Sequence, residues 1–382
     1  MTDDRLPEPD RAPGAPHPRE TEALFGQALA EQAFLTAYSS GRLHHGWLIT
    51  GPQGVGKATL AWRIARFLLA TPPETGDGLF GAPPPPETLD ISPDHPVAHR
   101  LRVLSDPGLF LLRRGGMGSS DRDREKAAAE GRFSANIRVD EIRELSGFLH
   151  LSSADGGRRV VIVDAADELN VQAANAILKM LEEPPARTTL LLICHQPARL
   201  LPTIRSRCRE LRCAPLGPDH MAQALAQAEA HVRPDEAEAL TALAAGSVGA
   251  ALRLLNLDGL ALYRDLLAIL ASLPALDRTR VLQLADSCAG RGKEDRLDLA
   301  LTLTDQLTAR LARTGALGQP PDRQAAEGEA QILSRLCPDA ASARRWADIA
   351  QTATDRARKA RAVNVDPAML VTDMMLQLQR AI

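Results

Sequence analysis

A glycine-rich run at residues 51–57 carries the strongest chemical signal in the sequence. Its letters, GPQGVGK, have the spacing G-x-x-x-x-G-K, in which glycines let backbone N–H groups curl around a phosphate and the lysine reaches the outer phosphates. The apolar residues 47–50 come before it, and residues 60–69, with apolar side chains at helical spacing, come after it. A phosphate-binding loop needs this order of strand, turn and helix. The predicted phosphate-binding residues are Gly51, Gly54, Gly56 and Lys57.

The helix start after this loop lacks a side chain that Mg²⁺-dependent hydrolysis of a nucleotide needs. The residue after Lys57 is ordinarily Ser or Thr, whose hydroxyl ligates Mg²⁺, and here it is Ala58. Thr59 carries a hydroxyl and is kept as a candidate for cofactor binding. One step along a helix turns a side chain by about 100° around the axis, so Thr59 cannot simply replace the missing ligand.

A second apolar run, residues 160–163, ends in Asp164. An acidic residue at the carboxyl edge of a parallel sheet can hold Mg²⁺ beside a nucleotide. The glutamate that activates water usually follows directly, and Ala165 stands there instead. Asp167 and Glu168 come later and are interpreted as an exposed turn or helix-start pair. Because two parts are missing, the sequence predicts a degenerate nucleotide site.

Two arginines follow a third apolar run, in the segment LLPTIRSRC at residues 200–208. An arginine side chain is always charged and offers a planar fork of donors that suits phosphate oxygens. Arg205 and Arg207 lie beside small residues, and their spacing alone favours a basic surface loop. A function for them needs support beyond spacing.

The elements that would position these residues alternate between strands and helices. Strands are predicted at residues 47–50, 160–163 and 189–193, and helices at 60–69, 137–150 and 173–183. Alternation of this kind predicts a parallel sheet with helices on both faces. Beyond about residue 216 the strand signals stop, and apolar residues at helical periods run almost to the C-terminus. The predicted fold class is an α/β domain followed by all-helical domains.

Composition and pattern divide the chain into four parts. Residues 1–19 are rich in Pro and charge and lack the basic start and apolar core of a signal peptide, so we expect a disordered tail on a cytoplasmic protein. Residues 20–215 form the predicted α/β domain. Residues 216–257 are assigned to a small helical domain and residues 258–382 to a larger one.

Two stretches interrupt the α/β pattern and are interpreted as surface insertions. They are the Pro- and Gly-rich residues 71–94 and the charged residues 113–131. His95 and His99 follow the first stretch at a spacing that could share a metal ion. Because a proline comes directly after His95 and no third ligand is evident, this stretch is interpreted as an ordinary helix start, and no metal site is predicted.

Composition limits the class of protein. The 382 residues are 45% hydrophobic and 24% charged, which is typical of a globular chain of two or three domains without a membrane span. A net charge of −3 gives no overall attraction to phosphate, so any contact with DNA must come from a local patch or from partner subunits. Five scattered cysteines without a C-x-x-C pair argue against a disulfide framework and a structural zinc site. They are Cys194, Cys208, Cys213, Cys288 and Cys337.

Four segments together resemble the clamp-loader AAA+ family. In chain order they are GRLHHGWLITGPQGVGKATLAWRIARFLL, IRVDEIREL, RRVVIVDAADELNVQAANAILKMLEEPP and LLPTIRSRC. The strong similarity covers residues 24–216, and weaker similarity continues at 245–252, which resembles the family's lid, and at 364–367, which resembles the entry to its last collar helix. The resemblance implies a RecA-like P-loop domain, a helical lid, and a helical collar that assembles into a ring.

The resemblance also implies a function for the arginine segment. Ser206, Arg207 and Cys208 match the family's SRC motif, whose arginine reaches across a subunit interface to the terminal phosphate of a neighbour's ATP. Such arginine fingers contribute about 10³–10⁵ in rate where measured, so Arg207 is the first candidate for catalysis in trans. Cys208 is interpreted as a packed thiol. Glu182 and Glu183 are either part of the subunit interface or a solvated helix end.

Four departures from the hydrolysing members of the family all affect the chain's own nucleotide site. Besides Ala58 and Ala165, Cys194 stands at a sensor position where Thr or Asn is usual, and Gly249 stands where the lid would offer an arginine. The arginine that serves a neighbour is present. This asymmetry favours a subunit that completes another subunit's site over an ATP-hydrolysing gamma/tau subunit.

We therefore expect a clamp-loader subunit that helps to load the sliding clamp onto primed DNA, with gamma/tau and delta subunits as further partners. ATP is the candidate ligand of its own loop, without significant hydrolysis, and no zinc is predicted because the four-cysteine module of many relatives is absent. No carboxylate constellation for two-metal nucleotidyl transfer is seen, so no intrinsic polymerase activity is expected. Two alternatives stay open, a gamma/tau-like ATPase and an AAA+ adaptor outside replication.

Overall fold

The computed structural model describes residues 6–12, 15–41, 43–71, 85–150 and 157–382. The chain forms two compact units, one of residues 1–228 with 246–249 and one of residues 229–245 with 250–382. The predicted insertion at residues 71–94 lies in part, at 72–84, outside the described residues.

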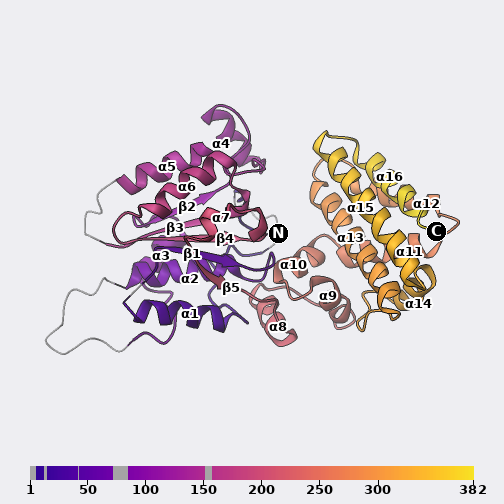
Figure 1. The fold of residues 1–382 in the computed structure, drawn as a ribbon, viewed down its shortest axis with the longest axis horizontal. Helices are drawn as coiled ribbons and strands as arrows, with labels where there is room; N and C mark the ends of the chain where they lie inside the picture. Colours follow the sequence, from indigo (N-terminus) through magenta and orange to yellow (C-terminus); the bar gives the residue numbers. More distant parts are fainter. Residues whose placement is uncertain (1–5, 13–14, 42, 72–84, 151–156) are drawn as a thin grey trace. The chain divides into compact units, whose positions relative to one another are not determined.

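The first unit is built on a sheet of five parallel strands in the order β2-β3-β4-β1-β5 (Figure 1). The strands are β1 Gly46–Thr50, β2 Leu109–Arg113, β3 Arg159–Asp164, β4 Thr188–Cys194 and β5 Arg209–Arg212. The three predicted strands correspond to β1, β3 and β4, which occupy the centre of the sheet and are apolar on both faces. The two outer strands, β2 and β5, were not predicted. In β5 only Leu211 is buried, so the strand lacks the continuous apolar run on which the prediction depends.

Helices cover both faces of this sheet, as the alternating pattern predicts. Figure 1 shows α1, α2 and α3 on one face and α5 and α6 on the other. The helices of the first unit are α1 Ala28–Ser39, α2 Lys57–Ala70, α3 Pro96–Arg102, α4 Asp121–Ala129, α5 Val139–His150, α6 Val171–Glu182, α7 Pro202–Arg205 and α8 Pro218–Gln227, with 3₁₀ turns η1 Ala166–Glu168 and η2 Pro197–Arg199.

The core on the α5 and α6 face follows from the two-residue period of the strands. Val161 and Val163 of β3 point to this face and pack with Leu145 of α5 and Ile177 of α6, and all four are buried. Burying such a side chain contributes about 1.5–3 kcal/mol each relative to leaving it exposed. Asn170 is the N-cap of α6, and its side chain accepts the N–H of Ala173. This cap fixes the residue at which the helix begins.

The predicted charged insertion at residues 113–131 has more order than a surface loop. Its first residue, Arg113, ends strand β2. Half of the rest is helix α4, whose first turn is capped by the Ser120 hydroxyl accepting the N–H of Asp123. Arg124 of this helix pairs with Asp140 at 2.7 Å, which ties α4 to α5. Charge content alone could not reveal the helix, because charged residues are typical both of surface loops and of exposed helices.

The second unit is all helical, as predicted. Its helices are α9 Ala237–Ala244, α10 Val248–Asn256 from Ala250 onward, α11 Gly259–Ala271, α12 Arg278–Cys288, α13 Glu294–Leu317, α14 Glu329–Leu336, α15 Ala340–Ala362 and α16 Pro367–Gln379. Local sequence sets their ends: Asp339 and Ser342 form a capping box at the start of α15, and Gly318 with φ 69° ends α13. The segment assigned to the predicted lid, residues 216–257, is divided, because α8 belongs to the first unit and α9 to the second.

A buried charge cluster lies inside the second unit. The carboxylate of Glu329 is fully buried and accepts hydrogen bonds from the Tyr263 hydroxyl at 2.6 Å and from Arg310 Nε at 2.7 Å and Nη2 at 2.9 Å. The backbone N–H of Ala325 also donates to it. The carboxylate is thus neutralised and hydrogen-bonded, as burial of a charge requires.

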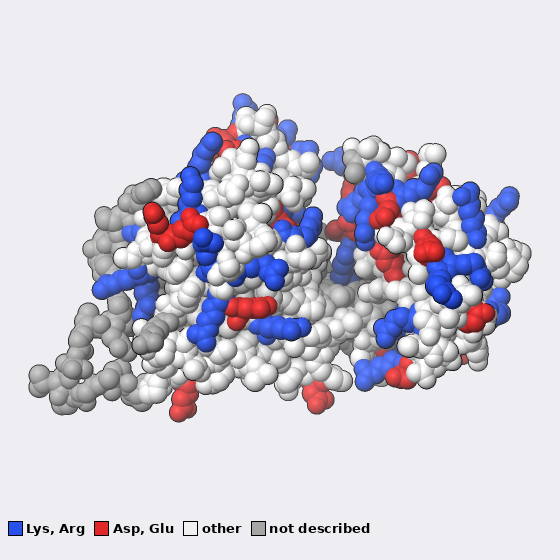
Figure 2. Space-filling view, viewed as in Figure 1, with Lys and Arg blue, Asp and Glu red and all other residues white. Residues whose placement is uncertain are grey.

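The surface is of mixed charge. On the face that Figure 2 shows, basic and acidic side chains are interspersed over both units, in agreement with the net charge of −3. Among the described residues, no helix combines the length and the apolar character that crossing a membrane would require.

Candidate nucleotide site and arginine motif

The glycine-rich loop connects β1 to α2, and its backbone needs glycine. Gly51, Gly54 and Gly56 have φ values of 140°, 78° and 100°, a region that residues with a Cβ rarely adopt. At Gly51 an added Cβ would also lie 2.3 Å from the carbonyl oxygen of Cys213. The loop therefore has the tight shape that the spacing of its glycines predicts.

Lys57 is the first residue of α2 and is buried. Its ammonium group donates hydrogen bonds to the carbonyl oxygen of Gly51, at 2.7 Å, and to that of Pro52. Burial lowers the pKa of Lys57 to about 8, while the acidic groups of Cys213 and Asp164 act in the opposite direction. The lysine is thus satisfied by carbonyl groups of its own loop.

A short segment, Gly246–Gly249, packs against the same loop. The backbone N–H of Gly249 donates to the carbonyl of Gly54 at 3.1 Å, and the Ser247 hydroxyl donates to the carbonyl of Gln53 at 2.8 Å. A Cβ added at Gly54 would lie 2.9 Å from the Cα of Gly249. The segment therefore touches the glycine loop directly, backbone against backbone.

Asp164 ends β3 and is half-buried. Burial, followed by the charges of Asp10 and Glu168, raises the pKa of Asp164 to about 8, although Lys57 and Arg113 act to lower it. Without a bound cation, the burial of this carboxyl group thus favours its protonated form.

The residues around Asp164 lack the other groups that a Mg²⁺-ATP site needs. Ala165 is buried and offers no carboxylate, and Ala58 offers no hydroxyl. Thr59, half-buried in the first turn of α2, is the nearest hydroxyl along the chain. Two side chains that hydrolysis of Mg²⁺-ATP ordinarily uses are therefore replaced by alanine at this loop.

Asp167 and Glu168 differ from the exposed pair that the sequence suggests. The Asp167 carboxylate accepts the backbone N–H groups of His195 at 2.9 Å and Gln196 at 3.1 Å, so it fixes the loop after β4. Glu168 pairs with Arg114 at 3.0 Å. The local sequence could not predict these contacts, because the partners of both acidic residues come from distant parts of the chain.

The end of β4 places two further groups near Lys57. Cys194 is fully buried, and burial together with the charge of Asp167 raises its pKa to about 12. His195 follows, and burial together with the charge of Lys57 lowers its pKa to about 4, so its imidazole is neutral at physiological pH. No sequence motif marks His195.

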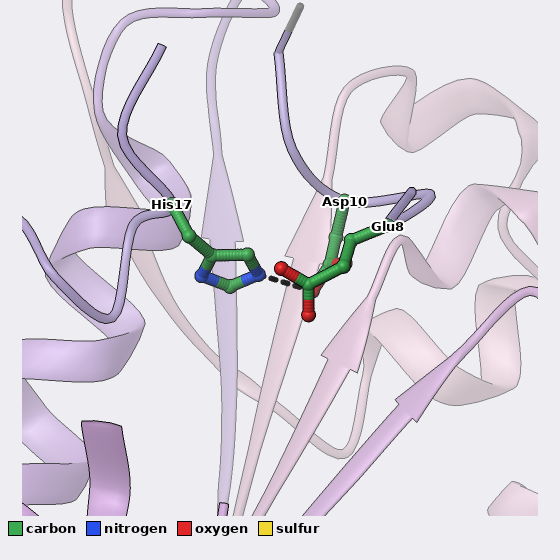
Figure 3. A group of neighbouring side chains, drawn as sticks. All are labelled: Glu8, Asp10 and His17. Atoms are coloured by element: carbon green, nitrogen blue, oxygen red, sulfur yellow. Dashed lines mark hydrogen bonds and ion pairs between the residues drawn. The ribbon is translucent and has the colours of Figure 1, made fainter. Parts of the chain in front are cut away.

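The N-terminal arm, residues 6–12 and 15–19, packs against the first unit, where the sequence predicts a disordered tail. His17 is buried with its ring edge against Trp62, at 5.8 Å between centroids. His17 Nδ1 accepts the backbone N–H of Arg19 at 3.1 Å, so Nε2 carries the proton that it donates to Asp10 at 3.1 Å. Figure 3 shows Glu8 and Asp10 beside this imidazole.

Ion pairs explain why this charged arm is ordered. Glu8 pairs with Arg19 at 2.6 Å and with Arg113 at 3.0 Å, and Asp10 also pairs with Arg113. One ligand atom from each of Glu8, Asp10 and His17 lies within 4.8 Å of the others, a spacing that could suit a metal ion. Because two guanidinium groups already neutralise the carboxylates, we interpret the group as an ion-pair cluster that anchors the arm.

His95, one of the two histidines whose spacing could share a metal ion, has a structural use. His95 is the N-cap of α3, and its Nδ1 accepts the N–H of Val97 at 3.2 Å. This geometry is the ordinary helix start that the following proline predicts.

The arginine motif and the glycine loop lie at opposite ends of strand β1. The motif is next to the N-terminal end of the strand, and the loop follows its C-terminal end. A Cβ added at Gly46, the first residue of β1, would lie 3.2 Å from the carbonyl oxygen of Arg207 and 3.3 Å from Cys208 Sγ. The glycine loop follows Thr50, the last residue of β1. Five strand residues at about 3.3 Å each separate the two ends by about 15 Å. The structure thus keeps Arg207 apart from Lys57 and Asp164.

Arg207 is half-exposed and held by two acceptors. Its Nη2 pairs with Glu182 Oε1 at 2.9 Å, and its Nη1 donates to the carbonyl of Thr203 at 3.1 Å. The Ser206 hydroxyl donates to the same carbonyl at 3.1 Å. Burial raises the pKa of the half-buried Cys208 to about 12, which agrees with a packed thiol.

A pocket of about 480 Å³ lies next to the motif. Its lining includes Ser206 and Cys208 of the motif, Arg205, and Glu210 of β5. The Glu210 carboxylate accepts the Thr50 hydroxyl at 2.6 Å. The motif therefore borders a hollow on the surface of the first unit.

Comparisons with known proteins identify relatives of this chain. Residues 99–217 match the family model described as DNA polymerase III, delta subunit. The DNA polymerase III subunit delta' of Pseudomonas aeruginosa is 38% identical over 216 residues, and that of Escherichia coli is 33% identical over 227 residues. The matched parts are 56% and 59% of this chain and the same shares of the relatives. The DNA polymerase III subunit tau of Salmonella typhimurium is 26% identical over 352 residues, 84% of this chain and 48% of the relative.

These similarities confirm the resemblance to clamp-loader proteins that the motifs indicate, and they confirm it for the delta-prime type. The matched segment, residues 99–217, contains Asp164, Glu182 and Arg207. Alignment spans a little more than half the length of the two delta' relatives.

Proposed function

We propose that this chain is a delta-prime-like clamp-loader subunit of a DNA polymerase III holoenzyme and helps to load the sliding clamp onto primed DNA. Its neighbours would be gamma/tau and delta subunits, and its place would be the cytoplasm. The similarity to delta' and tau subunits supports this family of partners.

The proposal assigns Arg207 the part of an arginine finger that acts on a neighbour's ATP. The observation that carries it is the position of Arg207 beside Gly46, at the end of β1 opposite the glycine loop. An arginine side chain cannot span the length of β1, so Arg207 cannot reach a phosphate held by Lys57. Its half-exposed guanidinium is open to another subunit.

The chain's own loop would not hydrolyse ATP. Lys57 is bound to carbonyl groups of the loop, Gly249 contacts Gly54, and the hydroxyl and glutamate of hydrolysing members are replaced by Ala58 and Ala165. The two alanines remove groups that Mg²⁺-ATP hydrolysis uses, and the other two contacts would have to change before a nucleotide could be held.

The test is to co-purify the chain with candidate gamma/tau, delta and clamp subunits and to measure ATP hydrolysis by the complex and by the chain alone. We expect a stable complex whose hydrolysis rises with clamp and primed DNA, and background turnover by the chain alone. Recovery of other partners without these subunits would contradict the clamp-loader proposal. Mg²⁺-dependent turnover by the isolated chain that Lys57→Ala abolishes would identify it as a gamma/tau-like ATPase.

A further inference from the structure

The acceptors of the Arg207 guanidinium come from two different elements. Glu182 is the last residue of α6, and Thr203 lies in α7. The two contacts use two different nitrogens, at 2.9 Å and 3.1 Å, so both the position and the plane of the guanidinium are fixed. A guanidinium has five N–H donors, and these contacts leave others for a phosphate.

Both acceptors stand on firmly packed backbone. Leu181, which precedes Glu182, is buried, and its carbonyl lies 2.9 Å from His45 Nε2, just before β1. Ile204, next to Thr203, is fully buried in the core on the same face of the sheet. The backbone segments that carry the two acceptors of Arg207 are therefore anchored independently of each other.

The pair is too exposed to matter much for stability. The side chains of Arg207 and Glu182 are 37% and 43% exposed, and ion pairs in such positions contribute little to folding. Its consequence is conformational: a free arginine side chain samples many rotamers, and ordering it before the phosphate arrives removes that entropy from the reaction.

We infer that Glu182 is a positioning residue for Arg207: its carboxylate orders the guanidinium for a triphosphate held by the neighbouring subunit. This inference rests on the proposed function of Arg207. Glu182 itself touches no reacting atom. It acts through the ion pair, while the Thr203 carbonyl holds the other end of the fork.

The experiment uses the complete clamp loader assembled with this chain carrying Glu182→Ala or Glu182→Gln. Glu144→Ala is the control, since Glu144 is an exposed glutamate on the neighbouring helix α5. Equal assembly by size and equal melting temperatures establish that the variants fold. ATP hydrolysis is then measured against ATP concentration with clamp and primed DNA present.

We expect Glu182→Ala to lower kcat about three- to tenfold with little change in KM, because an unordered arginine affects the transition state more than ATP binding. Glu182→Gln should recover part of the rate, since its amide oxygen can still accept from Arg207. Glu144→Ala should behave as wild type. In a chain that already carries Arg207→Ala, adding Glu182→Ala should cause no further loss.

Other outcomes distinguish a failure of this inference from a failure of the arginine-finger proposal for Arg207. If Arg207→Ala lowers the rate and Glu182→Ala leaves it unchanged or raises it, Arg207 acts in trans but Glu182 does not position it. A further loss on adding Glu182→Ala to Arg207→Ala would show that Glu182 acts by another route and would also overturn the inference. If Arg207→Ala itself has no effect, the arginine-finger assignment fails first.

Discussion

Gly249 donates its backbone N–H to the carbonyl of Gly54 at 3.1 Å, which places a second stretch of backbone against the glycine loop. Only glycine permits this approach at either residue. A Cβ on Gly54 would meet the Gly249 Cα at 2.9 Å, and a Cβ on Gly249 would meet the Gly54 Cα at 3.0 Å. The loop is thus involved in an internal contact, and the chain also carries alanine at positions 58 and 165.

Restoring the missing side chains should therefore not restore hydrolysis. For the double variant Ala58→Thr, Ala165→Glu, we expect ATP turnover by the isolated chain to stay at background. In this variant Gly249 still contacts Gly54, and Lys57 still donates hydrogen bonds to carbonyl groups of the loop. The measurement is phosphate release with and without Mg²⁺. Turnover that appears in the double variant and vanishes on adding Lys57→Ala would contradict this reading.

If Arg207 acts on a neighbour's ATP and the chain's own loop is inactive, two single substitutions should differ in an unusual way in their effect on ATP hydrolysis. In the assembled loader, Arg207→Ala should reduce clamp-stimulated ATP hydrolysis and clamp loading far more than Lys57→Ala, with assembly intact. The loss concerns only the site that Arg207 faces, where a finger contributes about 10³–10⁵ in rate, so other sites keep part of the total.

Two further variants sharpen this comparison. Arg207→Lys should rescue poorly, because a compact ammonium group cannot reproduce the planar fork. Arg205→Ala is the matched control, an exposed arginine two residues away in the same segment. Equal or greater damage from Lys57→Ala would mean that the chain serves its own nucleotide site.

Asp164→Asn should stabilise the protein in a pH-dependent way. The folded-state pKa of about 8 lies above the ordinary value of 3.8, so between these pH values the folded protein binds more protons than the unfolded chain. Stability then falls as pH rises through this window. We expect the asparagine variant to gain several kcal/mol at pH 8, since one pKa unit corresponds to about 1.4 kcal/mol, and nothing near pH 4. Denaturant titrations at several pH values, with the exposed Asp322→Asn as control, test this; a pH-independent difference would contradict it.

The second unit should depend strongly on the buried carboxylate of Glu329. Glu329→Gln leaves Arg310 without its charge partner in a buried cluster, and we expect a loss of about 2–4 kcal/mol. Tyr263→Phe removes one hydrogen bond and should cost about 1–2 kcal/mol. Because both act on one cluster, the double variant should lose less than the sum.

Calorimetry of the full chain measures these losses. Glu327→Gln, an exposed glutamate two residues away, is the control and should leave the melting temperature unchanged. Additive losses from Glu329→Gln and Tyr263→Phe would show that the tyrosine hydroxyl contributes independently of the carboxylate.

The order of the N-terminal arm should depend on Asp10. Asp10→Ala removes the acceptor of His17 and one partner of Arg113, and we expect a loss of about 2–4 kcal/mol and faster tryptic cleavage at Arg11 and Arg19. Limited proteolysis followed by mass spectrometry locates the cuts. Glu87→Gln, an exposed acid, should digest as wild type. Rapid cleavage at both arginines in the wild-type protein would support the disordered tail that composition suggests.

The central part of the fold could be predicted from the sequence because its signals are local. The strands β1, β3 and β4 are continuous apolar runs, and the helices α2, α5 and α6 have strong helical periods. The outer strand β5 could not be found in this way, since Arg209, Glu210 and Arg212 are exposed and the strand reads as a polar loop.

The sequence could name candidate residues for the site, and it could not show their contacts. Spacing located Lys57, Asp164 and Arg207, yet it could not reveal that Arg207 pairs with Glu182 or that Asp10 lies near Asp164. Such contacts join residues far apart in the chain, and their formation depends on how the strands are ordered. The contacts of the charged N-terminal arm could not be predicted for the same reason: its acidic residues resemble a solvated tail until Arg113 is placed beside them.

The packing of Gly249 on Gly54 also bears on how such a protein can change over evolutionary time. An arginine at position 249 would have to displace the loop backbone that now touches it, so that substitution would be unfavourable until the contact is broken. Breaking the contact alone would bring no catalytic gain while Ala58 and Ala165 remain. No single substitution at position 58, 165 or 249 would therefore supply all the groups that hydrolysing members of the family use.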